Sequence, residues 1–141
     1  MKAIVALLLP ALFASGPVFA EDVRLSVVVH GLQHERGSVR ASLYNDPDSF
    51  RKEARAVAVR QVSAVEGDAV IHFDGLAPGR YALMVYHDEN ADGKLNLRLG
   101  MFPREGYGLS NNPRVMGPPK FEASAFDVSG PETTTDIDVR Y

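Results

Sequence analysis

The sequence contains no cysteine among its 141 residues. This absence excludes a disulfide framework, a thiolate metal site, a catalytic cysteine and a lipid-modified N-terminal cysteine. The chain also has no run of basic residues. Its 15 Lys and Arg are outnumbered by 18 Asp and Glu, so the net charge is −3. A protein held to nucleic acid by phosphate contacts is therefore not expected. The length fits one domain, and the balance of apolar and charged residues is that of a folded protein.

Long hydrophobic runs are also missing beyond the first twenty residues. There, Lys2 precedes an apolar stretch over 3–14, and small residues occupy the −3 and −1 positions of a cut after Ala20. This layout is typical of a secretory signal peptide, and the run is shorter than the roughly 20 residues of a membrane span. We expect residues 1–20 to be removed, leaving 21–141 as a single periplasmic or secreted domain. Removal takes away Lys2 and no acid, so the net charge becomes −4.

Short apolar runs separated by turn residues follow one another along the rest of the chain. In the first of them, Val23, Leu25, Val27 and Val29 recur at every second position, the period of a strand with one buried face. Seven strands are predicted, at 23–29, 39–44, 56–62, 69–73, 80–86, 123–128 and 134–141. Because no amphipathic helix of useful length is present, we predict an all-β fold, a seven-stranded antiparallel β-sandwich of prealbumin or immunoglobulin type.

Residues 97–120 do not fit this strand spacing. The segment holds four Gly and four Pro among 24 residues, which regular secondary structure avoids. Loops of this length in a small domain are usually functional or disordered. The apolar side chains of the segment, including Phe102 and Tyr107, predict a loop packed over one end of the sandwich, as a binding loop or as a lid on the core.

The segment 87–96 carries the most informative pattern in the chain. It has the form of the front of a D-x-[DN]-x-[DN]-G calcium loop, in which alternate residues turn their oxygens onto one ion and Gly93 permits the sharp turn. The candidate ligands stand at offsets 1, 3, 5, 7 (through the main-chain carbonyl) and 9: Asp88, Asn90, Asp92, Lys94 and Asn96. Oxygen ligands without a thiolate favour Ca²⁺ over a transition metal, so calcium is the expected cofactor.

The closing ligand of this loop must come from elsewhere in the chain. Offset 12, where the helix–loop–helix version carries a bidentate Glu, is occupied by Leu99. Glu105 is our first choice for the missing ligand. With this ligand set we expect a modest affinity, about 0.1–1 mM. The alternative is an ion-free turn, since Asp, Asn and Gly are also ordinary turn residues.

Other chemistries find less support in the sequence. His30 and His34 are four residues apart, but they flank a turn rather than share a helix face, so a zinc site is not indicated. His87 precedes the acidic loop and is expected to hydrogen-bond a ligand carboxylate. An enzyme is the minority interpretation: a hydrolase in which Glu105 and a neighbour, Asp88 or His87, act as acid and base in a loop cleft.

Four stretches of the sequence resemble the DUF2141 family of exported bacterial proteins. They are residues 73–82 (FDGLAPGRYA), 87–95 (HDENADGKL), 103–112 (PREGYGLSNN) and 117–123 (GPPKFEA). The resemblance covers nearly all of 21–141 and implies an exported single domain, but it supplies no catalytic residue, because the family has no established function. The GLAPGRYA turn is also similar, more weakly, to prealbumin-like modules, which implies a seven-stranded sandwich.

Together these features predict an exported envelope protein that binds a ligand or has a structural role. In the preferred hypothesis, Ca²⁺ bound at 88–96 orders the segment 97–120, so that Phe102 and Tyr107 form a binding surface for an envelope protein or a glycan. No membrane span and no nucleic-acid partner are expected. The rival hypotheses are an ion-free structural or adhesion module and the hydrolase with Glu105 in its cleft.

Overall fold

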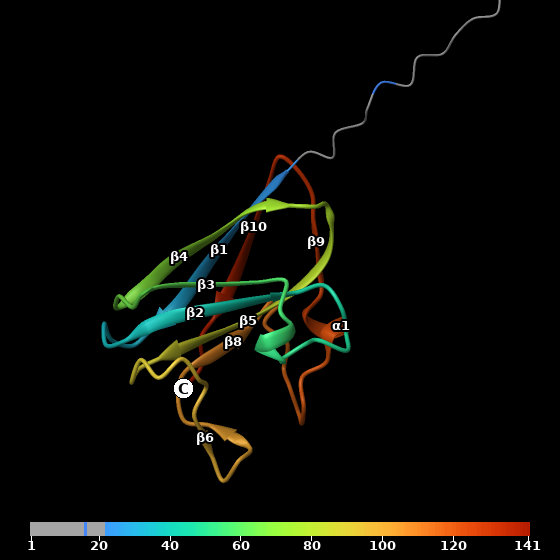
Figure 1. Ribbon diagram of the computed structural model, residues 1–141. Coiled ribbons are helices and arrows are strands. Elements are labelled where there is room, and N and C mark those ends of the chain that lie inside the picture. Colours follow the sequence, from blue (N-terminus) through green and yellow to red (C-terminus); the bar gives the residue numbers. More distant parts are fainter. Residues whose placement is uncertain (1–15, 17–21) are drawn as a thin grey trace, which may run out of the picture.

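Figure 1 shows the computed structural model of the protein, which describes residue 16 and residues 22–141. The expected signal peptide, 1–20, lies outside the described residues except for residue 16. No helix among the described residues has the length and apolar character needed to cross a membrane. The described part is mostly β, with these elements in chain order: β1 (Val23–Leu32), β2 (Ser38–Tyr44), the 3-10 turn η1 (Glu53–Arg55), β3 (Ala58–Ser63), β4 (Gly67–Leu76), β5 (Gly79–Asp88), β6 (Leu97–Arg98), β7 (Phe102–Pro103), β8 (Tyr107–Leu109), α1 (Phe121–Ser124), β9 (Phe126–Val128) and β10 (Glu132–Asp138).

Strand β1 is the centre of a three-stranded sheet with the order β10-β1-β4. Its predicted alternation is confirmed, because the valines and leucine at alternate positions from Val23 to Val29 are fully buried. Strand β4 runs antiparallel to β1, whereas β10 runs parallel to it. The predicted wholly antiparallel arrangement is therefore wrong for this pair. The physical reason is that β9 pairs with β5 in the other sheet, so the chain crosses between sheets before β10 and enters alongside β1 in the same direction.

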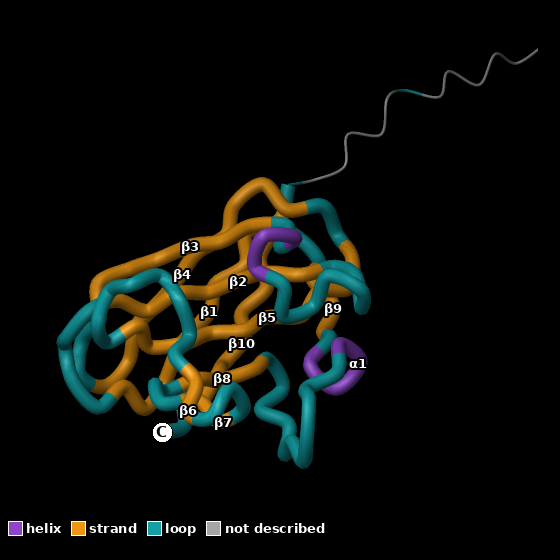
Figure 2. Tube along the Cα trace, turned by 60° about the horizontal axis from the view of Figure 1, so that its bottom comes forward, coloured by secondary structure: helices purple, strands orange, loops and turns teal. Residues whose placement is uncertain are grey.

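The second sheet has the order β3-β2-β5-β8, and β9 pairs with the beginning of β5. Figure 2 shows β2, β5 and β8 side by side, with the short β6 and β7 beyond β8. The two sheets share one buried apolar cluster, to which Leu25, Ile71 and Ile137 contribute from the first sheet and Leu43 and Leu83 from the second. Burying a side chain of this size stabilises the fold by about 1.5–3 kcal/mol, so this cluster is the main core.

A smaller apolar cluster covers the opposite face of β5. It consists of side chains from β2, β5 and the segments that pass over them: Tyr44, Phe50, Ala82, Leu109, Phe121 and Ala125. The rings of Tyr44 and Phe50 meet edge to face at 5.4 Å, and those of Phe50 and Phe121 at 5.9 Å. Since both faces of β5 are covered, its apolar run is nearly continuous and not alternating.

The structure differs from two sequence predictions around this second cluster. The strand predicted at 123–128 begins only at Phe126, because residues 121–124 form the helical turn α1. Phe121 and Ala125 are four residues apart and both pack into the cluster, which suits a helical turn. The segment 97–120, predicted as one loop, contains β6, β7 and β8.

His30 bridges the three strands of the first sheet and makes their stability depend on pH. Its Nδ1 lies 3.0 Å from Asp68 and its Nε2 2.7 Å from Asp136. The hydrogen bonds to Asp136 and Asp68 raise the pKa of His30 above its ordinary 6.5. The stabilisation is therefore complete below pH 6.5, where the unfolded chain is also protonated, and is lost as the pH rises through the raised pKa of the folded state.

We predict that urea denaturation midpoints of the wild type fall slightly between about pH 6 and about pH 8 through the His30 contribution. The effect is small because the three side chains are partly exposed to solvent. His30→Gln should remove this component, and His72→Gln, on the same sheet, should leave it in place. A His30→Gln variant with the same pH dependence as the wild type would contradict the assignment.

Candidate calcium-binding loop

The candidate loop begins where β5 ends, at the buried Asp88. The side chain turns back over the loop, so that Oδ1 accepts a hydrogen bond from the N–H of Asp92 at 3.1 Å and Oδ2 one from the N–H of Gly93 at 2.8 Å. Ala91 and Gly93 have positive φ values of 56° and 73°, which bend the chain around the carboxylate. Asp88 is 1% exposed. The loop is therefore folded around this carboxylate.

Gly37 fixes the backbone at the start of the loop. Strand β2 pairs Ser38 with Asp88, and the preceding Gly37 has φ +73°, a conformation that favours glycine. A Cβ at this position would overlap the backbone carbonyl of Asp88, which cannot move without breaking the pairing. The close approach holds the end of β5 in place.

We predict that Gly37→Ala lowers the free energy of unfolding by about 2–5 kcal/mol, from backbone strain and overpacking together. Gly67→Ala is the matched control, because Gly67 also has positive φ but a Cβ there would meet no atom within 4 Å. The control should cost only the strain, about 1–2 kcal/mol. Equal losses in the two variants, measured by urea denaturation, would show that the contact with Asp88 does not matter.

The other candidate ligands contact one another within the loop. Asn90 Oδ1 lies 3.4 Å from the side-chain amide of Asn96, which lies 3.5 Å from the carbonyl oxygen of Lys94, and the amide of Asn90 lies 3.3 Å from Asp92 Oδ2. These contacts are long for hydrogen bonds. The Asn90 side-chain oxygen and the Lys94 carbonyl oxygen thus both lie next to one amide nitrogen, that of Asn96.

Asp92 is charged at neutral pH. Its pKa is lowered, chiefly because its carboxylate accepts a hydrogen bond from the backbone N–H of Lys94 at 2.9 Å, and the amides of Asn96 and Asn90 add to the effect. The side chain is exposed. It thus adds a negative charge to the open side of the loop.

Glu105 joins the loop from the far side of the β6–β7 hairpin. Its Oε1 accepts a hydrogen bond from the N–H of Glu89 and its Oε2 one from the N–H of Asn96, both at 3.0 Å. The N–H of Arg104 also donates to the carbonyl of Asn96 at 2.8 Å. One carboxylate therefore holds both ends of the loop. Each oxygen keeps a second lone pair, and the role of Glu105 as a ligand stays a prediction.

The charge of this site is not balanced by side chains. Asp88 and Glu105 are 1% and 5% exposed, yet neither lies within 4 Å of a Lys, Arg or His nitrogen among the described residues. In the part of the chain that the structure describes, their side-chain oxygens are bonded by backbone N–H groups alone. Burying a carboxylate without a cation is costly. The arrangement would gain from a positive ion.

The comparison with protein families matches residues 27–136 to a family described as "Uncharacterized protein conserved in bacteria (DUF2141)". The chain belongs to the DUF2141 family. The matched range contains the whole loop 88–96 and Glu105. No curated protein and no solved structure matches the chain.

A histidine cluster in this DUF2141 protein lies next to the loop. His34 Nε2 lies 2.8 Å from Glu89 Oε1, and the rings of His34 and His87 are 4.6 Å apart. The buried His87 uses both nitrogens, one toward the hydroxyl of Tyr141 at 2.6 Å and one toward the carbonyl of Arg36 at 2.7 Å. The prediction that His87 bonds a ligand carboxylate is wrong, because these two partners occupy it. No sequence pattern pointed to Tyr141, which lies 54 residues away.

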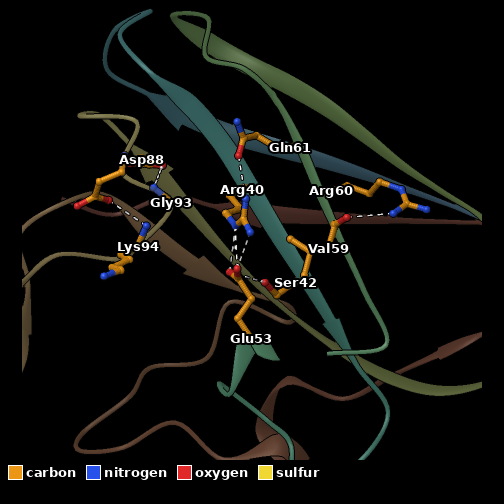
Figure 3. A network of polar contacts seen from close by, with 10 residues as sticks. Arg40, Ser42, Glu53, Val59, Arg60, Gln61, Asp88, Gly93 and Lys94 are labelled. Atoms are coloured by element: carbon orange, nitrogen blue, oxygen red, sulfur yellow. Dashed lines mark hydrogen bonds and ion pairs between the residues drawn. The ribbon is translucent and has the colours of Figure 1, made fainter. Parts of the chain in front are cut away.

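A hollow of about 340 Å³ lies beside the loop on the outer face of the second sheet, where Gly93, Lys94 and Leu95 form one wall. Glu53 lines this hollow. Its carboxylate accepts hydrogen bonds from the guanidinium of Arg40, the shortest at 2.6 Å, and from the hydroxyl of Ser42 at 3.2 Å (Figure 3). The bond from Arg40 lowers the pKa of Glu53. Sequence reasoning did not find this pair, because the turn that carries Glu53 shows no periodic signal.

Proposed function

We propose that this DUF2141 protein is an exported envelope protein whose loop 88–96 binds one Ca²⁺. The observation that carries the proposal is the pair of buried carboxylates, Asp88 and Glu105, which have no cationic partner among the described side chains. The proposed ligands are oxygens of Asp88, Asn90, Asp92, Lys94 (main chain) and Asn96, with Glu105 closing the site.

Calcium is the ion that this donor set favours. All the donors are carboxylate, amide or carbonyl oxygens, which hard cations prefer, and the loop offers neither thiolate nor imidazole at the ligand positions. Mg²⁺ demands strict octahedral geometry at about 2.1 Å and keeps much of its water, whereas Ca²⁺ accepts six to eight irregular ligands. The expected affinity, about 0.1–1 mM, is in the range of extracellular calcium modules. It suits the periplasmic or secreted location that the N-terminal segment predicts.

The ion would fix the base of the segment 97–120 for binding. At this base, the backbone N–H of Arg104 donates a hydrogen bond to the carbonyl of Asn96, and the N–H of Asn96 donates one to the Glu105 carboxylate. Phe102 is exposed beyond this base, which supports its proposed place on a binding surface for an envelope protein or glycan. Tyr107 contributes less, since it is half-buried and its backbone pairs with Arg140. A prealbumin-like or immunoglobulin-like sandwich remains the proposed class of the scaffold.

Two rival functions make different demands on the same residues. An ion-free structural or adhesion module is favoured by the backbone hydrogen bonds of Asp88 and Glu105, which hold the loop by themselves. The hydrolase would need Glu105 and a neighbour facing a substrate. Its support is weaker, because Glu105, Asp88 and His87 are all buried and present no open face to a substrate.

A calorimetric titration of the mature chain with CaCl₂ tests the proposal. We expect one ion per chain for the wild type and no measurable binding for Asp92→Ala. The exposed Asp92 can be removed without disturbing the core, so the variant should stay folded. A wild type that takes up no calcium at millimolar concentration would favour the ion-free module.

A further inference from the structure

The β6–β7 hairpin concentrates the exposed apolar surface of the molecule. Leu97, Leu99, Met101 and Phe102, here called the hairpin tip, are 45%, 81%, 70% and 57% exposed. They make up four of the nine large exposed apolar residues among the described ones, within six positions of the sequence. Single exposed apolar residues are common, but clusters mark surfaces for interaction. The hairpin tip therefore has the character of an interaction surface.

The hairpin is held in a shape that presents its tip to the outside. Over residues 22–141, its strands pair only with each other, Leu97 with Pro103 and Arg98 with Phe102, and with neither of the larger sheets. In Figure 1 it extends away from the sheets, beyond β8. The turn is closed by Leu99 and Gly100 at positive φ and by a bond from Met101 N–H to the Arg98 carbonyl. The base of the hairpin is fixed by the backbone hydrogen bonds of Asn96 with Arg104 and with the Glu105 carboxylate.

The charge around the tip has the opposite sign to that of the chain. Residues 94–104 include Lys94, Arg98 and Arg104 and no acid, in a protein of net charge −3. All three are exposed, and none forms an ion pair within the described part of the chain. Free cations beside an exposed apolar tip match a surface that is negatively charged outside and apolar beneath.

We propose that the hairpin tip inserts into an anionic phospholipid surface. Leu99, Met101 and Phe102 would enter the boundary between headgroups and acyl chains, while Arg98 and Arg104 contact lipid phosphates. Stable peripheral binding takes two such signals together, apolar insertion and basic attraction. The inference does not rest on the calcium site, because the hydrogen bonds of Asn96 with Arg104 and Glu105 hold the base of the hairpin without an ion. It goes beyond the proposed function by naming a lipid surface, in place of an envelope protein or glycan, as the partner of the exposed Phe102.

Co-sedimentation of the mature chain with vesicles tests this inference, in EDTA so that calcium plays no part. We expect binding to vesicles of phosphatidylglycerol mixed with phosphatidylcholine, weaker binding at high salt, and little binding to pure phosphatidylcholine. Arg98→Gln should weaken binding about fivefold, since one basic residue near such a surface contributes about 1 kcal/mol. The double variant Met101→Ser, Phe102→Ser should weaken it at least about tenfold through the lost apolar insertion.

The double variant Val57→Ser, Val65→Ser is the matched control, because these residues are also exposed and apolar but lie outside the hairpin. It should bind like the wild type, and thermal melting should show all variants folded. Absence of binding to the anionic vesicles, or equal binding by the tip variant, would overturn the proposal. So would a wild-type dimer that Met101→Ser, Phe102→Ser converts to a monomer, since the tip would then be covered by a second copy. Binding of the hairpin tip to a protein or glycan, with no binding to the vesicles, would also count against lipid insertion.

Discussion

The melting temperature of the mature protein is expected to rise by about 4–14 °C between EDTA and 10 mM CaCl₂. At an affinity of about 0.1–1 mM, this concentration stabilises the folded state by about 1.4–2.7 kcal/mol, because the ion binds the folded chain and not the unfolded one. In a domain of this size each kcal/mol moves the melting temperature by about 3–5 °C. Differential scanning fluorimetry measures the shift directly.

Asp92→Ala separates this effect from nonspecific salt. The carboxylate of Asp92 is exposed, and among the described residues its hydrogen bonds stay within its own loop. Its removal should therefore leave the melting temperature in EDTA almost unchanged and abolish the rise with calcium. MgCl₂ at equal concentration should give a much smaller shift, because the irregular loop does not offer the octahedral geometry that Mg²⁺ demands. Equal shifts for wild type and Asp92→Ala would show that calcium acts elsewhere.

The second large effect is expected from Glu105→Ala, which should lower the free energy of unfolding by about 3–5 kcal/mol in EDTA. Each oxygen of the buried carboxylate accepts a backbone N–H, from Glu89 and from Asn96, and hydrogen bonds to charged groups contribute about 1.5–3 kcal/mol each. The truncation leaves both half-buried donors without their acceptor. The loss should appear as a lower urea denaturation midpoint.

Two further variants serve as comparisons, Glu105→Gln at the same position and Glu66→Ala as a surface control. Glutamine keeps one acceptor oxygen, so its loss should be about half that of alanine. Glu66 is exposed in the turn before β4, and its replacement should change stability by less than about 0.5 kcal/mol. If Glu105→Ala were as stable as Glu66→Ala, the carboxylate would not hold the loop.

The parts of the fold that local patterns determine could be predicted from the sequence. The alternation in β1 and the turn residues around 74–79 gave strands at the right places, because the side-chain period and the turn conformations are properties of a few neighbouring residues. The offsets of Asp88, Asn90 and Asp92 likewise described a closed loop, since a carboxylate at the first position reaches the N–H groups four and five residues later.

The parts that depend on distant contacts could not be predicted. Whether β10 runs parallel to β1 is decided by which sheet β9 joins, and no local pattern encodes that choice. The segment 97–120 looked uniform in its Gly and Pro content, yet its hairpin is exposed while Leu109 and Val115 pack against the second cluster. His87 meets Tyr141 only because the end of the chain returns to β5.

A crystal structure of the mature protein grown with CaCl₂ tests the calcium loop most directly. The account predicts one ion at 88–96, with oxygens of Asp88, Asn90, Asp92 and the Lys94 carbonyl at about 2.3–2.6 Å from it. A crystal grown in millimolar calcium in which the loop holds only water, with Asp88 and Glu105 bonded to the same backbone N–H groups, would contradict the account.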